Sequence, residues 1–536
     1  MSSKLLRGTF ILTLGTIISK VLGLFYVIPF YHIVGDDGNA LYQFAYIPYT
    51  IFISIATAGV PLAVSKFISK YNAIEEYAVG RRLYKSGQIV MLASGIISFL
   101  ALYMLAPVIA EISPHDEIVT VEDGTTVIRA VSFALILVPI MSLTRGFFQG
   151  HQSMGPSALS QVIEQIVRIG FVLIGAYVVL HVIGGSLVSA VSVATFAAFI
   201  GAIGGLASLV WYWYKRKPFL DELLAQDKGT IEISLKDMYK EIILYAAPFV
   251  FVGIANPLFQ FIDQLTFSKA MDSIGLAKEA VGSFAVLNFQ THKLVIIPVS
   301  LATAFSLALV PSITKAFVEN DRSSLNYQLN QAFQVLLYLT LPAAMGLSLL
   351  AEPVFTMFYD HKDLGTEVLR AYAPVAVLFA YFLVTAAILQ GINEQRFTVL
   401  SLLTGLLIKL SLNIPFIKLF ETNGAVYATA TGYLAAILIN LFVIKKFADY
   451  PFKLVIRRSV LIIIFTALML MGAGAAYKIL TLFLSPETTF SALLIVSICA
   501  IVGAGIYFYL SFKTRLIYYL FGEKVDRAMK KLRLRS

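Results

Sequence analysis

Apolar residues run in blocks of about 20 to 28 positions along this chain, and short polar stretches separate the blocks. A helix needs about 20 consecutive apolar residues to cross a hydrocarbon layer of about 30 Å, so each block has the length of one membrane span. The pattern predicts an all-α integral membrane protein with about fourteen transmembrane helices. The predicted helices lie near residues 6–33, 41–69, 84–110, 127–150, 158–183, 187–214, 240–268, 282–311, 327–350, 367–391, 397–420, 424–444, 457–480 and 489–512.

Composition supports the same interpretation. Of the 536 residues, 58% are hydrophobic and 13% are charged, and the mean hydropathy is +0.82. Soluble domains are about half apolar and about one quarter charged. This chain therefore has more apolar residues than the core of a soluble protein can bury. The one cysteine, Cys499, excludes an internal disulfide and a metal site built from cysteines. We expect no metal and no other cofactor.

Lysine and arginine gather in alternate loops. Segments 70–85, 215–217 and 445–458 are basic, as is the tail from Lys513, whereas segment 111–126 holds five acidic residues and no lysine or arginine. Because basic loops stay on the cytoplasmic side, we predict that both termini are cytoplasmic and that the acidic segment faces outward. Membrane topology then accounts for the net charge of +10 without nucleic-acid binding.

The two ends of the chain differ in character. Residues 1–33 run apolar far beyond the core of a signal peptide and lack a suitable small-residue cleavage site, which predicts a retained first helix. Residues 513–536 mix aliphatic and aromatic side chains with many cations. This composition suits a basic amphipathic helix on an anionic leaflet, or a solvated tail that only enforces topology.

A shift of 241 residues brings the chain into register with itself. The shift places VIRA at 127–130 on VLRA at 368–371, FFQG at 147–150 on ILQG at 388–391, and Arg168 on Lys409. Three matches in one register indicate a duplicated unit of six helices. Because six is even, both copies enter the membrane from the same side, and we expect the substrate path between the halves.

The repeat divides the chain into four predicted parts. These are an N-terminal six-helix lobe at 1–235, a C-terminal six-helix lobe at 236–455, an appended pair of helices 13 and 14 at 456–512, and a basic cytoplasmic tail at 513–536. The appended pair has no counterpart in the repeat. It can therefore provide additional surface for an unusual substrate.

Several ionisable side chains fall inside the predicted spans, where a charge is costly unless it is paired or lines water. An excess of cations suits an anionic head group such as a pyrophosphate, because lysine and arginine bind phosphate well. The positions near mid-span are Lys20, Arg168, His292, Lys293 and Lys409, and those nearer the ends of spans are Arg145, Glu164 and Asp263.

Each of these positions has a structural interpretation beside the functional one. Glu164 and Arg168 are four residues apart on one helix face, so they can form an ion pair instead of a ligand site. Arg145 lies near a cytoplasmic helix end and can extend its charge to the interface. His292 can couple transport to protons or simply pack with a hydrogen bond, and Asp263 can be a counter-ion or a site for a coupling cation.

Three stretches resemble the polysaccharide and lipid-linked oligosaccharide flippases. They are GTFILTLGTIISKVLGLFYVIPF, ALYQFAYIPYTIFISIATAGVPLAVSKFISKY and NFQTHKLVIIPVSLATAFSLALVPSI, and they are similar in particular to the MurJ-type lipid II flippases. The resemblance covers essentially the whole chain. It implies a fourteen-helix fold with two V-shaped lobes, shared with the multidrug exporters of the same superfamily, and alternating access at the bacterial cytoplasmic membrane. It also implies a role in peptidoglycan synthesis and cell division.

The resemblance implies a substrate and two binding residues. The substrate is an undecaprenyl-pyrophosphate-linked saccharide, and the implied partners are membrane lipids and proteins of cell-wall synthesis or division. Lys20 after Ser19, and Lys293 before Leu294, match cationic positions of the family and are predicted to bind substrate. The chain departs from Gram-negative members at four positions, where it has His292, Tyr26, Asn39 and Phe52 in place of charged residues.

Other function classes fit less well. A drug exporter for organic cations would carry acidic residues in its cavity, whereas the deep charges here are mostly basic. A membrane glycosyltransferase or ligase would need a sizeable acid-rich or metal-binding outer loop, but segment 111–126 is short and shows no ligand spacing. We therefore predict a flippase and no enzyme activity. A flippase for another lipid-linked polymer or for a spore-cortex precursor remains the alternative.

Overall fold

The computed structural model describes residues 3–57, 59–115 and 119–521, and in these ranges every regular element is a helix. Twelve helical stretches are long and apolar enough to cross a membrane, or thirteen if the bent pair Leu235–Ala247 and Phe249–Asp272 forms one span. The predicted first helix contributes a shorter apolar stretch, Leu14–Phe25. Counted with it, these segments correspond to the fourteen that the apolar blocks predict.

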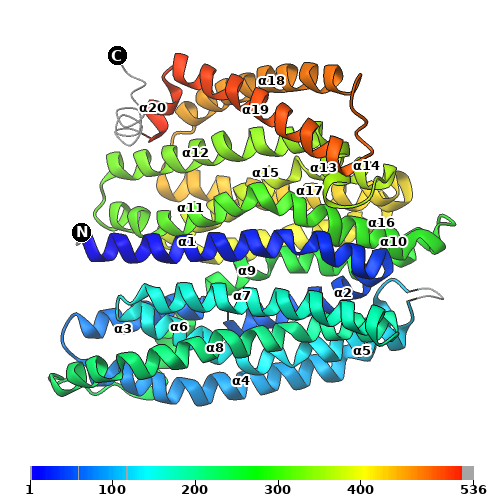
Figure 1. Cartoon of the computed structure of the whole chain (residues 1–536). Coiled ribbons are helices and arrows are strands. Elements are labelled where there is room, and N and C mark those ends of the chain that lie inside the picture. The colour runs from blue at the N-terminus through cyan, green and yellow to red at the C-terminus, as the bar shows by residue number, and fades with distance from the viewer. Residues whose placement is uncertain (1–2, 58, 116–118, 522–536) are drawn as a thin grey trace. The chain divides into compact units, whose positions relative to one another are not determined.

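The chain forms two compact units, residues Met1–Ala285 and Val286–Ser536, which we call unit 1 and unit 2. Figure 1 shows the helices in their colours along the chain. Unit 1 contains α1 (Ser3–Phe25), α2 (Val27–Thr57), α3 (Val60–Asn72), α4 (Tyr77–Ile112), α5 (Val121–Ser132), α6 (Ala134–Gly150), α7 (Met154–Tyr177), η1 (Val178–Val182), α8 (Leu187–Ala225), α9 (Leu235–Asp272), η2 (Ala277–Glu279) and α10 (Ala280–Ala285). Unit 2 contains η3 (Val286–Thr291), α11 (His292–Val318), α12 (Arg322–Leu349), α13 (Ala351–Phe358), α14 (Asp363–Tyr372), α15 (Val375–Gly391), α16 (Gln395–Phe420), α17 (Thr422–Ala448), α18 (Lys453–Leu480), α19 (Thr489–Lys513) and α20 (Leu516–Phe521).

The sequence repeat reappears in the element boundaries. A shift of 241 residues carries both ends of α6 onto both ends of α15, and it carries the start of α7 onto the start of α16. The turns that follow α6 and α15 also match, because Gln152 has φ 56° and Asn393, at the same shift, has φ 62°. Both copies therefore end this helix with a residue in the left-handed conformation, which non-glycine residues rarely adopt.

The boundary between the units lies one helix beyond the predicted repeat boundary at residue 235. Helix α9, which opens the second repeat, packs on α2, α3 and α4 and belongs to unit 1. The division at residues 1–235 and 236–455 describes the duplication in the sequence and stays a prediction. Of the predicted tail at 513–536, residues 522–536 lie outside the described residues.

Small residues set the spacing of the helices in unit 1. A Cβ placed on Gly201 of α8 would lie 2.8 Å from the Cβ of Arg168 and 2.9 Å from the carbonyl oxygen of Glu164, both on α7. A Cβ placed on Gly15 of α1 would lie 2.9 Å from the Cβ of Ala158, also on α7. Membrane helices associate through such close backbone contacts, since lipid offers no hydrophobic driving force between them. Helix α7 is thereby held between α1 and α8.

The first two predicted spans, 6–33 and 41–69, have the wrong boundaries. The chain continues as helix through the expected polar break, with a kink at Gly35, which has φ 67° and ψ −166°. The breaks fall instead at Tyr26 and just before α3, where Gly59 has φ 76°. Pro29 and Pro61 follow these breaks within the first turns of α2 and α3, a position in which proline costs no helical hydrogen bond.

The segment between α8 and α9 is bound to the turn between α3 and α4 by polar contacts. Lys228 forms an ion pair with Glu75 at 2.9 Å, and Asp227 Oδ1 accepts a hydrogen bond of 2.8 Å from the backbone N–H of Ala78. The Glu76 carboxylate accepts hydrogen bonds from the backbone N–H and the hydroxyl of Thr230. These bonds hold the pKa of the Glu76 carboxyl below its usual range. The basic stretches 70–85 and 215–217, which include or border these segments, thus lie at one end of unit 1.

In unit 2, the appended helices α18 and α19 pack on α12 and α13. Tyr507 donates a hydrogen bond of 2.9 Å to the carbonyl oxygen of Tyr338, and Arg458 donates one of 2.8 Å to Gln334. An apolar cavity of about 360 Å³ lies between these helices, beside Pro342 and Cys499. The predicted terminal pair is therefore an integral part of this unit.

We expect Glu76→Gln to loosen the segment that joins α8 to α9. A spin label at Gln226→Cys, in a Cys499→Ser background, should become more mobile at pH 7 because the charged hydrogen bonds to Thr230 are lost. The folded pKa of Glu76 is lowered, so its stabilising effect is complete above the ordinary carboxyl pKa of about 4.3 and disappears as the pH falls through the lowered value. Label mobility in the parent should therefore rise at acid pH and stay flat in the variant.

The matched control is Glu232→Gln, an exposed carboxylate in the same segment. This control should leave label mobility as in the parent. Equal mobility of the Glu76→Gln variant and the parent at pH 7 would contradict the proposed role of Glu76.

Candidate functional site

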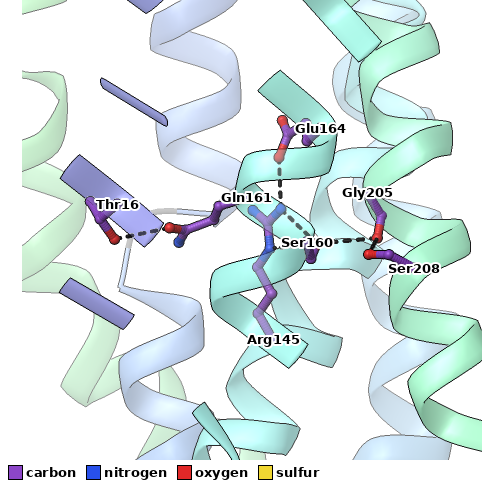
Figure 2. A network of polar contacts seen from close by, with 7 residues as sticks. All are labelled: Thr16, Arg145, Ser160, Gln161, Glu164, Gly205 and Ser208. Carbon is purple, nitrogen blue, oxygen red and sulfur yellow. Dashed lines mark hydrogen bonds and ion pairs between the residues drawn. The ribbon is translucent and has the colours of Figure 1, made fainter. Parts of the chain in front are cut away.

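The strongest polar network among the predicted site residues lies in unit 1 and joins α6 to α7. Arg145 of α6 forms an ion pair of 2.7 Å with Glu164 of α7, and its Nη2 also donates a hydrogen bond of 2.8 Å to Ser160. Ser160 in turn donates to the carbonyl oxygen of Gly205 on α8 at 3.1 Å. Figure 2 shows these side chains converging on Ser160. Three helices thus share one network around an ion pair.

A second contact extends this network to α1. Thr16 donates a hydrogen bond of 2.9 Å to Gln161 Oε1, in the turn of α7 that carries Ser160. The ion pair itself is mostly buried, since the Arg145 and Glu164 side chains are 13% and 23% exposed. Buried pairs are strongly destabilised when one member is removed, so Arg145 and Glu164 depend on one another.

The expected ion pair between Glu164 and Arg168 is not formed. Glu164 pairs with Arg145, which reaches it from α6, and the Arg168 guanidinium turns to α2, where it donates a hydrogen bond of 3.2 Å to the Tyr42 hydroxyl. The Arg168 guanidinium also lies 5.2 Å from the ring centroid of Tyr46. Spacing on one helix predicted a shared face correctly, but it could not reveal the competing arginine from the neighbouring helix.

Two further predicted residues of unit 1 differ in exposure. Lys20 is exposed on α1. Asp263 is buried on α9 at 4% exposure, between the buried glutamines Gln260 and Gln264. Gln264 donates hydrogen bonds to the Phe44 carbonyl oxygen at 3.1 Å and to Ser113 Oγ at 2.6 Å, which fixes this part of α9 against α2 and the end of α4.

In unit 2, His292 and Lys293 begin α11 just after the π-helical turn η3. His292 is buried, and its Nδ1 lies 2.9 Å from the Tyr372 hydroxyl of α14. The Lys293 ammonium lies 5.7 Å from the ring centroid of Phe289 and is partly exposed. The adjacent side chains therefore differ in exposure: the histidine is buried, and the lysine is partly exposed.

Lys409 belongs to a separate contact in unit 2. Its side chain is fully buried, and its ammonium donates hydrogen bonds to the Ala425 carbonyl oxygen at 3.1 Å and to Thr429 Oγ1 at 2.6 Å. Both acceptors are on α17, so Lys409 ties α16 to α17. Its repeat counterpart Arg168 instead binds a tyrosine hydroxyl on α2, so the two positions carry the same charge in different surroundings.

The sequence analysis missed the tyrosines that surround Arg168. Tyr42, Tyr46 and Tyr49 lie at spacings of four and three on α2, which places them on one helix face. Tyr26, at the break between α1 and α2, places its hydroxyl 3.4 Å from that of Tyr42. The helical spacing of the three tyrosines was a visible signal, but nothing in the sequence indicated that this face meets Arg168.

Two family models and several known proteins match this chain. Residues 5–317 match the family model described as polysaccharide biosynthesis protein, and residues 248–415 match the model described as MatE. The chain is 48% identical to the lipid II flippase MurJ of Bacillus subtilis over 539 residues, which covers 99% of each chain. It is 29% identical over 506 residues to the uncharacterized membrane protein YabM of the same organism, covering 94% of this chain and 91% of the relative.

A solved structure shows the same fold. The inward closed conformation of a lipid II flippase MurJ aligns with a TM-score of 0.62 at 18% identity and covers 95% of this chain and 100% of its own. Together with the membrane-spanning helices, these matches identify a multi-pass membrane protein with the fold of the MurJ and MATE transporters.

We expect Lys409→Met to preserve thermal stability and Lys409→Ala to lower it. Methionine fills the volume of the lysine without a buried charge, and replacing a buried ion by an apolar residue is often neutral or stabilising. Alanine leaves a cavity, which costs about 2–5 kcal/mol for a large buried side chain. Melting curves of the purified protein in detergent would test this, and a Lys409→Met variant that melts as low as Lys409→Ala would contradict it.

Proposed function

We propose that this chain, which belongs to the polysaccharide biosynthesis protein family, translocates lipid II across the bacterial cytoplasmic membrane by alternating access. The observation that carries the proposal is the 48% identity to the Bacillus subtilis lipid II flippase MurJ along 99% of both chains. The match extends over essentially the full length of both chains. Transport requires no bond to be made or broken, so we propose a transporter that is not an enzyme.

The head group of lipid II is an anion, and the accessible deep charges of the chain are cations. Lys20 on α1 and Lys293 on α11 are the two lysines among the predicted residues that retain exposure. We propose that they bind the pyrophosphate, because a lysine ammonium acts on phosphate as a mobile point charge. The organic cations of a drug exporter would be repelled by the same side chains.

The other predicted site residues take different roles in the proposal. Arg168 adds a third cation and is treated below. Arg145 and Lys409 are held by protein acceptors, so we propose that they contribute less directly to substrate binding. Asp263 and His292, which are buried, are proposed as coupling or counter-ion positions, and Glu164 as the counter-ion of Arg145.

The proposed orientation places both termini in the cytoplasm. It is supported by the basic stretches 70–85 and 215–217, which include or border two loops that contact each other at one end of unit 1. Cytoplasmic loops of membrane proteins carry this excess of lysine and arginine. We further propose that proteins of cell-wall synthesis or division are partners, since they consume the lipid-linked precursor that reaches the outer leaflet.

We expect depletion of this protein in its host to make newly made lipid II inaccessible from outside the cell. Wild-type protein should restore accessibility, whereas Lys20→Ala and Lys293→Ala should each lower it about tenfold or more, because a charge-assisted contact to phosphate is lost. Accessibility to an externally added enzyme that cleaves lipid II would be the measurement.

The control for general damage is Lys418→Ala, which removes a cation near the end of α16. This variant should complement fully. Unchanged accessibility on depletion would overturn the lipid II assignment, and full rescue by both lysine variants would overturn the proposed site while leaving the assignment intact.

A further inference from the structure

Arg168 is a cation in the interior of unit 1 without a carboxylate partner. In the described part of the chain, no acidic side chain lies within ion-pair distance of it, and its one hydrogen bond is the 3.2 Å contact to the Tyr42 hydroxyl. A guanidinium carries five N–H donors, so most of its donors lack an acceptor. A charge at membrane depth is costly unless it is compensated, which makes Arg168 a receptor for an anion.

The tyrosines of α2 hold the guanidinium in place. Tyr42 and Tyr46 stack with their ring centroids 5.5 Å apart and their planes at 20°, and Arg168 lies over the Tyr46 ring. Tyr42 is fully buried, and its hydroxyl lies 3.4 Å from that of Tyr26. This buried hydroxyl is the one that accepts the hydrogen bond from Arg168. Tyr46 and Arg168 are partly exposed. The cluster therefore holds a partly exposed aromatic ring and a partly exposed cation in contact with one another.

Glu164 would neutralise Arg168 if it were free. It lies four residues away on the same helix, the spacing at which opposite charges pair, but Arg145 engages it at 2.7 Å. With two arginines and one glutamate, the cluster retains a net positive charge. Arg145 thus keeps Arg168 available to a ligand without touching the ligand itself.

We propose that Arg168 and Tyr46 form a subsite for the junction of pyrophosphate and first sugar in a lipid-linked saccharide. Arg168 binds a phosphate oxygen through its open donors, since a guanidinium fork matches phosphate geometry. Tyr46, which is partly exposed, packs the exposed part of its ring against the sugar. Tyr42 is a positioning residue that orients Arg168. The subsite rests on the proposed function, because it takes the same substrate as Lys20 and Lys293.

The two halves of the subsite can be separated with three probes. Purified full-length protein in lipid nanodiscs would be titrated with prenyl pyrophosphate-linked disaccharide, with the same prenyl pyrophosphate without sugar, and with the uncharged prenol. Arg168→Gln should weaken binding of both pyrophosphates about tenfold or more and leave the prenol unaffected. Tyr46→Leu should weaken the sugar-bearing ligand about tenfold more than the sugar-free pyrophosphate, and Tyr46→Phe should retain the binding of both because the ring remains.

Tyr42→Phe tests the positioning role. It keeps the buried ring and removes the acceptor for Arg168, so it should weaken both pyrophosphates in equal proportion and by less than Arg168→Gln. A purely structural defect would instead lower the melting temperature and change prenol binding as well. Equal affinities of the wild type, Arg168→Gln and Tyr46→Leu for the sugar-bearing ligand would overturn the subsite. Failure of the wild type itself to bind that ligand would overturn the proposed function instead.

The role of Arg145 gives an independent test. Arg145→Met releases Glu164, which can then pair with Arg168, so we expect this variant to weaken pyrophosphate binding about as much as Arg168→Gln. Adding Glu164→Gln removes the competing carboxylate and should restore binding to within about threefold of the wild type. A double variant as weak as Arg145→Met alone would show that Arg145 acts directly on the ligand and would overturn this division of charges.

Discussion

Glu164 is the one carboxylate on α7, and both Arg145 and Arg168 lie near enough in the fold to compete for it. Its pairing with Arg145 leaves the Arg168 charge without this carboxylate. Glu164 pairs with Arg145, and this pair links α6 to α7 and, through Ser160, to α8. The arrangement requires close contact of α7 with its neighbours, which Gly15 and Gly201 permit. The close packing of α8 on α7 at Gly201 also adjoins Arg168, whose guanidinium turns toward the tyrosines of α2. Packing, charge and the candidate site thus depend on one ion pair and the small residues around it.

The chain also shows how a membrane protein fixes the ends of its helices. The segment between α8 and α9 is not a free loop, since it caps the N-terminus of α4 through Asp227 and is held by Glu75 and Glu76. These contacts attach the segment just before α9 to the turn between α3 and α4. Farther along, α9 bends by 45° between Ala247 and Phe249, beside the break at Gly59. Polar contacts thus fix the chain just before α9, and close packing against Gly59 accompanies the bend within it.

Much of the fold could be predicted from the sequence, because span length and loop charge are properties of the chain itself. The fourteen segments followed from these, and the repeat and the terminal pair followed from the match of the chain with itself at a shift of 241 residues. The helix breaks at Tyr26 and Gly59 did not, since their positions depend on which helix packs against them. The cationic candidates were found because a charge in an apolar block is conspicuous. Their partners were not, since Arg145 reaches Glu164 from another helix, and Tyr42 lies 126 positions from Arg168 along the chain.

The offset between the repeat and the folded units has an evolutionary consequence. If the chain arose by fusion of two copies of a six-helix ancestor, the first helix of the second copy now packs on the first copy, as α9 does on α2, α3 and α4. The first helix of the first copy, α1, packs within its own copy on α7. A domain-swapped dimer of separate chains would exchange this helix in both directions, so a one-sided placement fits a change made after the two copies were fused. Fusion would equally have allowed the copies to diverge in side chains, so that the same position became Arg168 in one and Lys409 in the other.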